Sequence, residues 1–169
     1  MGFSLVPQYS FRNLTDIKPE FLTDLGITFF MIDLDNTIAA YNEHVSSDSV
    51  LQWFEGIRNA GITPFIISNS TRTNRVEAFS KELGTGFVMK AGKPSPEGLR
   101  KAMAIAVFDA KVSALAGDQI FTDTIAASRA GVVSILVRPK RFTNPFLALR
   151  YYVEAPFRLL CKNKGSRKV

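Results

Sequence analysis

The run of apolar and β-branched residues at 28–32, T-F-F-M-I, constrains the fold of this chain more than any other feature. Such a run has no polar residue at alternate positions, which is typical of a strand buried on both faces of a parallel sheet. Two carboxylates, Asp33 and Asp35, follow at once, and the turn formers Asn36 and Thr37 come next. Because side chains alternate along a strand, both carboxylates face one side while the chain stays extended. At the carboxyl end of the strand they can then point into the crevice where open α/β sheets bind ligands.

The spacing of Asp33 and Asp35 indicates a site for a cation. Two close carboxylates disfavour joint ionisation unless a cation lies between them, and a hard divalent ion with oxygen ligands, Mg²⁺ above all, meets that need. The sequence has one cysteine, Cys161, and one histidine, His44, so neither a cysteine cluster nor a histidine-rich metal site can form. We expect His44 to lie on a surface loop. An ordinary acidic loop after a core strand is the alternative, and the D-x-D pair alone leaves both interpretations open.

The rest of the chain alternates between strand and helix patterns. Its 169 residues, with a hydrophobic content of 46%, suffice for one domain with a substantial core. Further strands are predicted at 62–67, 87–89, 112–116 and 132–137, and helices at 15–24, 46–61, 71–83, 96–108 and 122–130. We expect residues 1–13 to be irregular. This alternation predicts an α/β fold with a doubly wound, Rossmann-like parallel sheet of about five strands.

Three further strand ends carry polar side chains that suit a phosphate or a metal ion. Ser68 and Asn69 stand just ahead of a helix N-terminus, which favours phosphate binding, although plain helix capping also explains them. Lys93, in A-G-K-P, is a point charge that can reach a phosphate or hold a carboxylate, or it is a surface lysine. Asp118 and Asp123, in G-D-Q-I-F-T-D, follow the next strand and add a second acidic signal.

Together these motifs resemble a known family. D-x-D-N-T, S-N, G-K-P and G-D-x-x-x-x-D stand in this order at four strand ends, and the pattern resembles the haloacid dehalogenase superfamily of phosphohydrolases over residues 28–137. The segments F-M-I-D-L-D-N-T, F-I-I-S-N-S and A-G-D-Q-I-F-T-D resemble the capless YqeG branch, the IIIA-type phosphatases, whose relatives include phosphatidylglycerophosphate phosphatases. Ser70 departs from this branch, which favours Asn there, and this affects substrate contacts more than the chemistry.

The resemblance implies a role for each residue of the motifs. Asp33 would attack phosphorus to form an aspartyl-phosphate. Asp35 would protonate the leaving oxygen and then activate water. Mg²⁺ would be held by the Asp33 side chain, the Asp35 backbone carbonyl and Asp118. Ser68 and Lys93 would hold the phosphoryl oxygens.

Three residues are given supporting roles. Asp123 would orient Lys93 or a metal-bound water, and Asn69 and Thr37 would contact the substrate. Phospho-receiver domains share the doubly wound fold, an acidic pair and a later lysine. They place the acceptor aspartate after the third strand, however, where this chain has Lys90–Lys93. The receiver interpretation is therefore disfavoured.

The spacing of the motifs leaves no room for a cap domain. After a helix and a strand are placed, neither the stretch from Asp33 to Ser68 nor that from Ser68 to Lys93 can house one. An open site suits a phosphate presented on a surface, and the resemblance favours phosphatidylglycerophosphate, an anionic phospholipid, as the phosphorylated substrate. A soluble phosphatase of a sugar phosphate or nucleotide, or a non-catalytic RNA-binding module, are the alternatives.

The last part of the chain differs in composition from the rest. We expect a phosphatase core at 1–141 and a basic, aromatic-rich helix and tail at 142–169. The chain carries a net charge of +6, yet residues 138–169 hold nine Lys or Arg against one acid, Glu154, so the remainder is slightly acidic. Aromatic residues mixed with Arg and Lys suit a membrane interface, a nucleic acid, or packing on the core. The first residues lack a signal-peptide pattern, so a cytoplasmic protein, peripheral on the inner membrane face, is expected.

Overall fold

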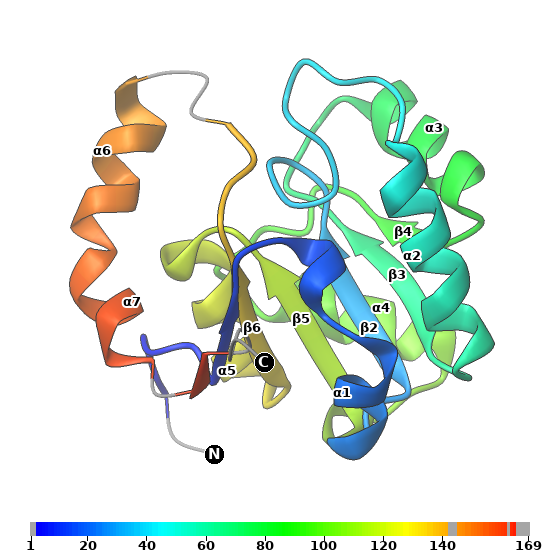
Figure 1. Ribbon diagram of the computed structural model, residues 1–169, viewed down its shortest axis with the longest axis horizontal. Helices are drawn as coiled ribbons and strands as arrows, with labels where there is room; N and C mark the ends of the chain where they lie inside the picture. Colours follow the sequence, from blue (N-terminus) through cyan, green and yellow to red (C-terminus); the bar gives the residue numbers. More distant parts are fainter. Residues whose placement is uncertain (1–2, 142–144, 162, 165–169) are drawn as a thin grey trace.

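The computed structural model describes residues 3–141, 145–161 and 163–164. Its centre is a sheet of seven parallel strands in the order β4-β3-β2-β5-β6-β1-β7 (Figure 1). The strands are β1 Tyr9–Phe11, β2 Phe29–Asp33, β3 Thr63–Ile67, β4 Gly86–Val88, β5 Ser113–Gly117, β6 Val133–Val137 and β7 Asn163–Lys164. The five predicted strands are β2 to β6, and the predicted α/β parallel fold is confirmed.

Helices cover both faces of the sheet (Figure 1). They are η1 Leu14–Asp16, α1 Pro19–Asp24, α2 Asp48–Asn59, α3 Thr73–Leu83, α4 Glu97–Ala106, η2 Ala110–Val112, η3 Ile120–Thr124, α5 Ile125–Ala130, α6 Pro145–Val153 and α7 Ala155–Leu160. Successive side chains of β2 point to opposite faces of the sheet. Phe30 packs with the side chains of α2 and α3, and Phe29 packs with those of α4 and α5. Burial on both faces explains why this strand is continuously apolar.

The expectation for the N-terminal residues was wrong. Residues 9–11 are not irregular but form β1, which pairs in parallel with β6 so that Tyr9 lies opposite Ile135. A strand of three residues is too short to show a period of its own, and its partner lies far away in the sequence. The helix predicted at 15–24 is shorter, because a separate 3₁₀ turn, η1, precedes α1.

The topology leaves the carboxyl ends of the central strands uncovered by any inserted domain. Between β2 and β3 the chain adds only α2, and between β3 and β4 only α3, so the capless architecture is confirmed. Strand β2 lies between β3 and β5, which places the end of the acidic motif at the middle of the sheet edge. No helix in the described part of the chain is both long and apolar enough to span a bilayer.

Candidate active site

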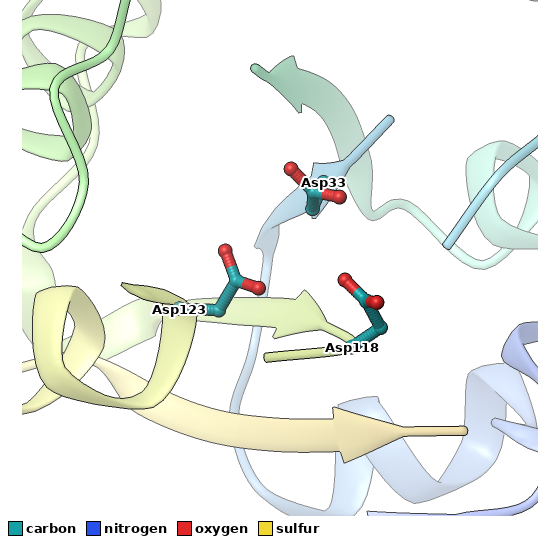
Figure 2. A group of neighbouring side chains, drawn as sticks. All are labelled: Asp33, Asp118 and Asp123. Carbon is teal, nitrogen blue, oxygen red and sulfur yellow. The ribbon is translucent and has the colours of Figure 1, made fainter. Parts of the chain in front are cut away.

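Three carboxylates from the segments that end β2 and follow β5 meet at the carboxyl-terminal edge of the sheet. Asp33 ends β2, Asp118 follows β5, and Asp123 lies in the π-helical turn η3. Figure 2 shows their side chains directed toward a common space. All three residues are buried, and one oxygen from each lies within 4.8 Å of the others. Gly117 has no room for a Cβ, because such an atom would overlap the Asp123 carboxylate.

Lys93 lies within this group and joins two of its members. Its Nζ donates to Asp33 Oδ1 at 2.6 Å, to Asp123 Oδ1 at 2.7 Å and to the Ile67 carbonyl at 3.1 Å. Burial alone would lower the pKa of this ammonium group, but the charges of Asp123 and Asp33 outweigh burial and raise it. The lysine is therefore a permanent cation at the site across the physiological pH range.

The end of β3 fixes the backbone that carries Lys93. The Asn69 side chain donates from Nδ2 to the Lys93 carbonyl at 2.8 Å, and its Oδ1 accepts from the Lys93 amide at 2.9 Å. Ser68 is fully buried, and its Oγ accepts from the Ser70 amide at 3.0 Å. Asn69 therefore fixes the backbone of the loop that carries Lys93, an interaction that the sequence did not indicate.

The acidic group has the properties of a cation site. Burial, opposed by Lys93 and reinforced by Asp123, raises the pKa of Asp33 from 3.8 to about 7. Burial and the Asp33 charge raise the pKa of Asp118 well above its usual value. Asp118 Oδ1 is buried and has no hydrogen-bond partner among the described residues. A divalent cation with oxygen ligands would supply that missing partner and would favour the ionised carboxylates, so these residues fit a divalent metal.

Asp35 lies outside this group of carboxylates. Its Oδ1 accepts from Arg75 Nη1 at 2.6 Å, and the guanidinium of Arg75 also donates to the carbonyls of Ala40 at 2.9 Å and Glu43 at 3.2 Å. The Arg75 guanidinium lies over the ring of Phe79, and the Arg75 side chain is only 5% exposed. Arg75 thus holds the Asp35 carboxylate in one orientation. The sequence did not indicate this role, because Arg75 lies on the buried face of α3 and belongs to none of the motifs.

Replacing Arg75 with Lys is expected to lower kcat by about tenfold, because one ammonium group cannot replace a guanidinium that bonds three acceptors. The free energy of unfolding should fall by about 1–3 kcal/mol as buried carbonyls lose their donors. Steady-state kinetics and thermal unfolding measure the two effects. The exposed Arg100→Lys on α4 is the matched control. A kcat unchanged in Arg75→Lys would show that this contact does not position Asp35 for the reaction.

A concavity opens beside Asp35. It has a volume of about 320 Å³ and is lined by Asp35, Tyr41, Asn69, Ser70, Thr71 and Arg72. Burial and the charges of Asp35, Asp118 and Asp33 raise the pKa of Tyr41 to about 12. The hydroxyl therefore stays protonated and can donate to a ligand. Neither Tyr41 nor Arg72 had been singled out in the sequence, since both lie in loops without a motif.

The loop after the nucleophile candidate holds two further polar side chains. Asn36 adopts a left-handed backbone, with φ of 63°, and its amide donates to the Ala39 carbonyl. Asn36 and Thr37 are almost fully buried, yet Asn36 Oδ1 and Thr37 Oγ1 have no hydrogen-bond partner among the described residues. This loop therefore offers unused polar atoms next to the carboxylate group. His44 is exposed, as expected.

Comparisons with known proteins find a matching family, a curated relative and similar folds. Residues 7–131 match the family model of haloacid dehalogenase-like hydrolases. The chain is 30% identical over 162 residues to "Probable phosphatase YqeG" of Bacillus subtilis, which covers 95% of this chain and 93% of that protein. Similar solved structures include an uncharacterized protein from Listeria monocytogenes serotype 4b (TM-score 0.58, 16% identity, covering 70% of this chain and 84% of that one). The cobalt-bound deoxy-D-mannose-octulosonate 8-phosphate phosphatase of Haemophilus influenzae is also similar (TM-score 0.50, 16% identity, covering 81% and 92%).

Proposed function

The chain belongs to the haloacid dehalogenase-like hydrolases and is a phosphatase of the YqeG type, and from that premise we propose that it removes the terminal phosphate of phosphatidylglycerophosphate through an aspartyl-phosphate. The observation that carries the chemistry is the contact of Lys93 Nζ with both Asp33 and Asp123, with Asp118 beside them. A buried cation beside a carboxylate nucleophile can stabilise the negative charge of a phosphoryl group during its transfer.

In the first step a carboxylate oxygen of Asp33 forms a bond to phosphorus while the bond from phosphorus to the leaving oxygen breaks. Asp35 gives its proton to that oxygen, so the product leaves as a neutral alcohol. In the second step Asp35 takes a proton from water, the water oxygen attacks phosphorus, and inorganic phosphate and the Asp33 carboxylate are released. Ser68 directly follows β3 and Lys93 lies in the loop after β4, and both would bind the phosphoryl oxygens. Arg75 keeps Asp35 in place.

Asp33, the Asp35 carbonyl and Asp118 would hold a divalent cation, which we propose to be Mg²⁺. When bound, the cation supplies positive charge that offsets the charge of the phosphoryl group. Asp123 is committed to Lys93 through Oδ1, and its Oδ2 accepts from the Gln119 amide at 3.1 Å. We therefore propose that Asp123 orients Lys93 and does not bind the metal directly.

Mg²⁺ is expected to stabilise the protein more at high pH than at low pH. The folded pKa values of Asp33 and Asp118 lie above the usual value of 3.8. Without metal, these groups therefore contribute most to stability below about pH 4. The contribution of Asp33 is lost as the pH rises through about 7, and that of Asp118 as the pH rises through its own raised pKa. Protons compete with the metal for the same oxygens. At about a hundred times its Kd, Mg²⁺ should raise the free energy of unfolding by about 2.7 kcal/mol near pH 8 and by much less near pH 5.

Thermal unfolding at several pH values, with and without Mg²⁺, measures this effect. Asp118→Asn should abolish most of the difference, while Asp109→Asn, which changes an exposed aspartate outside the motifs, should leave it intact. A metal effect that does not grow with pH would contradict the assignment of these carboxylates as ligands.

The lipid substrate is supported by the helices that border the site. One small cavity is lined by residues from both the active-site loops and the α6 region. They are Asn36, Asp118 and Gln119 from the loops, and Leu147, Arg150, Tyr151 and Glu154 from the α6 region. Figure 1 shows α6 and α7 standing along one side of the sheet. The helices expose apolar side chains to solvent: Phe146, Leu149, Tyr152 and Val153 on α6, and Leu159 and Leu160 on α7. An exposed apolar set beside an active site is typical of a membrane-contact surface.

Buried Glu154 fixes these helices to the catalytic core. Its Oε1 accepts from the Phe121 amide at 2.9 Å, and its Oε2 from Arg158 Nη2 at 3.2 Å. Phe157 packs edge-on against Phe121. Because Phe121 belongs to η3, which also carries Asp123, one side of the helix pair is held against the active site while the opposite side stays exposed. We therefore propose that residues 142–169 extend the core 1–141 toward an anionic membrane surface at the inner membrane face.

The experiment is phosphate release from phosphatidylglycerophosphate in mixed micelles with Mg²⁺, run beside soluble sugar phosphates and nucleotides. The double variant Leu149→Ser and Tyr152→Ser should lose most lipid turnover, while Ile105→Ser, an equally exposed apolar residue on α4, should retain it. Turnover of soluble esters alone would exclude the lipid as the substrate and would leave the phosphatase activity established.

A further inference from the structure

A second concavity lies beside the acidic loop, away from Lys93. It has a volume of about 380 Å³ and is lined by Arg12, Asn13, Leu14, Thr37, Arg138, Pro139 and Lys140. We call it the cationic pocket, because Arg12, Arg138 and Lys140 line it and none of its lining residues is acidic. It has no counterpart among the motifs read from the sequence, since its cations come from two distant segments.

The strand pairing builds this pocket at the ligand-binding edge of the sheet. Phe11, the last residue of β1, lies opposite Val137, the last residue of β6, so Arg12 and Arg138 leave the sheet side by side. The Arg138 amide donates to the Arg12 carbonyl at 3.4 Å. The Lys140 amide donates to the Asn36 carbonyl at 3.0 Å and so ties the pocket to the loop that follows Asp33.

The charges in the pocket are not neutralised by ion pairs. Within the described ranges 3–141 and 145–161, no carboxylate lies in salt-bridge distance of Arg12, Arg138 or Lys140. Partial burial lowers the pKa of Lys140, which is still exposed to solvent, and Glu43, from outside the pocket lining, partly opposes this shift. Like charges around one concavity repel, so a bound anion would relieve the repulsion. The buried Thr37 hydroxyl, which has no partner among the described residues, lines the same concavity.

We propose that the cationic pocket binds a second phosphate group of the substrate, one that is not cleaved. Two guanidinium groups and an ammonium group match the oxygens of a phosphate, which guanidinium binds bidentately. The pocket borders the active site: Thr37 of the loop after Asp33 lines it, and its residue Pro139 also lines the cavity that contains Asn36 and Asp118. A leaving group that carries its own phosphate can therefore extend into it. The inference rests on the proposed function and narrows the substrate to phosphomonoesters with a second phosphate. The phosphodiester of a lipid headgroup and the terminal phosphate of a soluble bisphosphate share this chemistry.

The test compares propanediol monophosphate, propanediol bisphosphate and phosphatidylglycerophosphate in micelles as substrates. The triple variant Arg12→Gln, Arg138→Gln and Lys140→Gln is set against Lys81→Gln, Lys101→Gln and Lys111→Gln, which removes three exposed cations from elsewhere. For the pocket variant we expect KM to rise about 100-fold for a substrate with two phosphates and to change by less than about twofold for the monophosphate. A rise for the micellar lipid alone identifies the headgroup phosphodiester, and a rise for the bisphosphate alone identifies the soluble class.

A binding measurement separates this inference from the proposed function. Calorimetric titration of propanediol bisphosphate into Asp33→Asn protein, with and without the three pocket substitutions, requires no turnover. Binding weakened by the pocket substitutions and not by the control set supports the pocket even if no substrate is hydrolysed. Equal affinity and equal KM in both sets would overturn it, whatever the fate of the phosphatase assignment.

Discussion

Replacement of Asp33 with Asn is expected to lower kcat/KM for every phosphomonoester by at least about 10³-fold, because an amide oxygen cannot form and release the aspartyl-phosphate. The protein should remain folded. Asp33 is one of three crowded carboxylates, and burial makes its charged form unfavourable, so a neutral side chain of the same shape fits the site. Phosphate release under saturating Mg²⁺ measures the loss, and circular dichroism checks the fold.

The control is Asp24→Asn, which changes an exposed aspartate at the end of α1 and should leave kcat/KM unchanged. Substantial turnover by folded Asp33→Asn protein would contradict the nucleophile assignment and would favour direct attack by water.

Replacement of Lys93 with Met should cost both activity and stability. Lys93 is the cation shared by Asp33 and Asp123, so its removal leaves buried carboxylates without a partner, at a cost of about 3 kcal/mol near neutral pH. The loss of a preorganised positive charge at the phosphoryl group should lower kcat by at least about 10²-fold.

The stability loss in Lys93→Met should depend on pH in a defined direction. Lys93 lowers the pKa of Asp33, so without it the carboxyl pKa rises further above 3.8, and protonation at low pH removes the uncompensated charge. In the unsubstituted protein the pKa of Lys93 is raised, so its side chain stays charged. The difference in free energy of unfolding between the two proteins should therefore be small near pH 4 and should widen toward about pH 8.

Urea unfolding at several pH values measures this difference. Lys90→Met, an exposed lysine of the same loop, is the control and should show neither effect. A stability loss that is independent of pH would indicate that packing, and not charge, explains the role of Lys93.

The sheet could be predicted from the sequence where strands are locally distinctive. Strand β2 is buried on both faces, and its uninterrupted apolar run shows this directly. Strand β1 has three residues, and its hydrogen-bonding partner β6 lies more than a hundred residues away, so no local pattern marks it. The sequence predicts one short helix bracketed by Pro145 and Pro156, whereas the structure has two: α6 begins at Pro145, and Pro156 lies in the first turn of α7.

The candidate site likewise has a part that could be predicted from the sequence and a part that could not. The meeting of Asp33 and Asp118 follows from one rule, that the carboxyl ends of parallel strands lie at the same edge of a sheet. Asp123 joins them from η3, the turn that follows β5. The partner of Asp35 could not be predicted, because Arg75 lies forty residues away, on a helix whose other buried residues are mostly apolar. The cationic pocket was equally hidden, since Arg12 and Arg138 meet only through the pairing of β1 with β6. Charges that meet through tertiary pairing carry no signal in the local sequence.

The most direct test of the central claim is to trap the covalent intermediate. Asp35→Asn protein, which should form the aspartyl-phosphate and hydrolyse it slowly, is mixed with substrate and Mg²⁺, reduced with borohydride and digested for mass spectrometry. We predict homoserine in place of Asp33, only when substrate is present, and no modification of any other carboxylate in the digest. Rapid turnover without any modification of Asp33, or modification of a different carboxylate, would contradict the account.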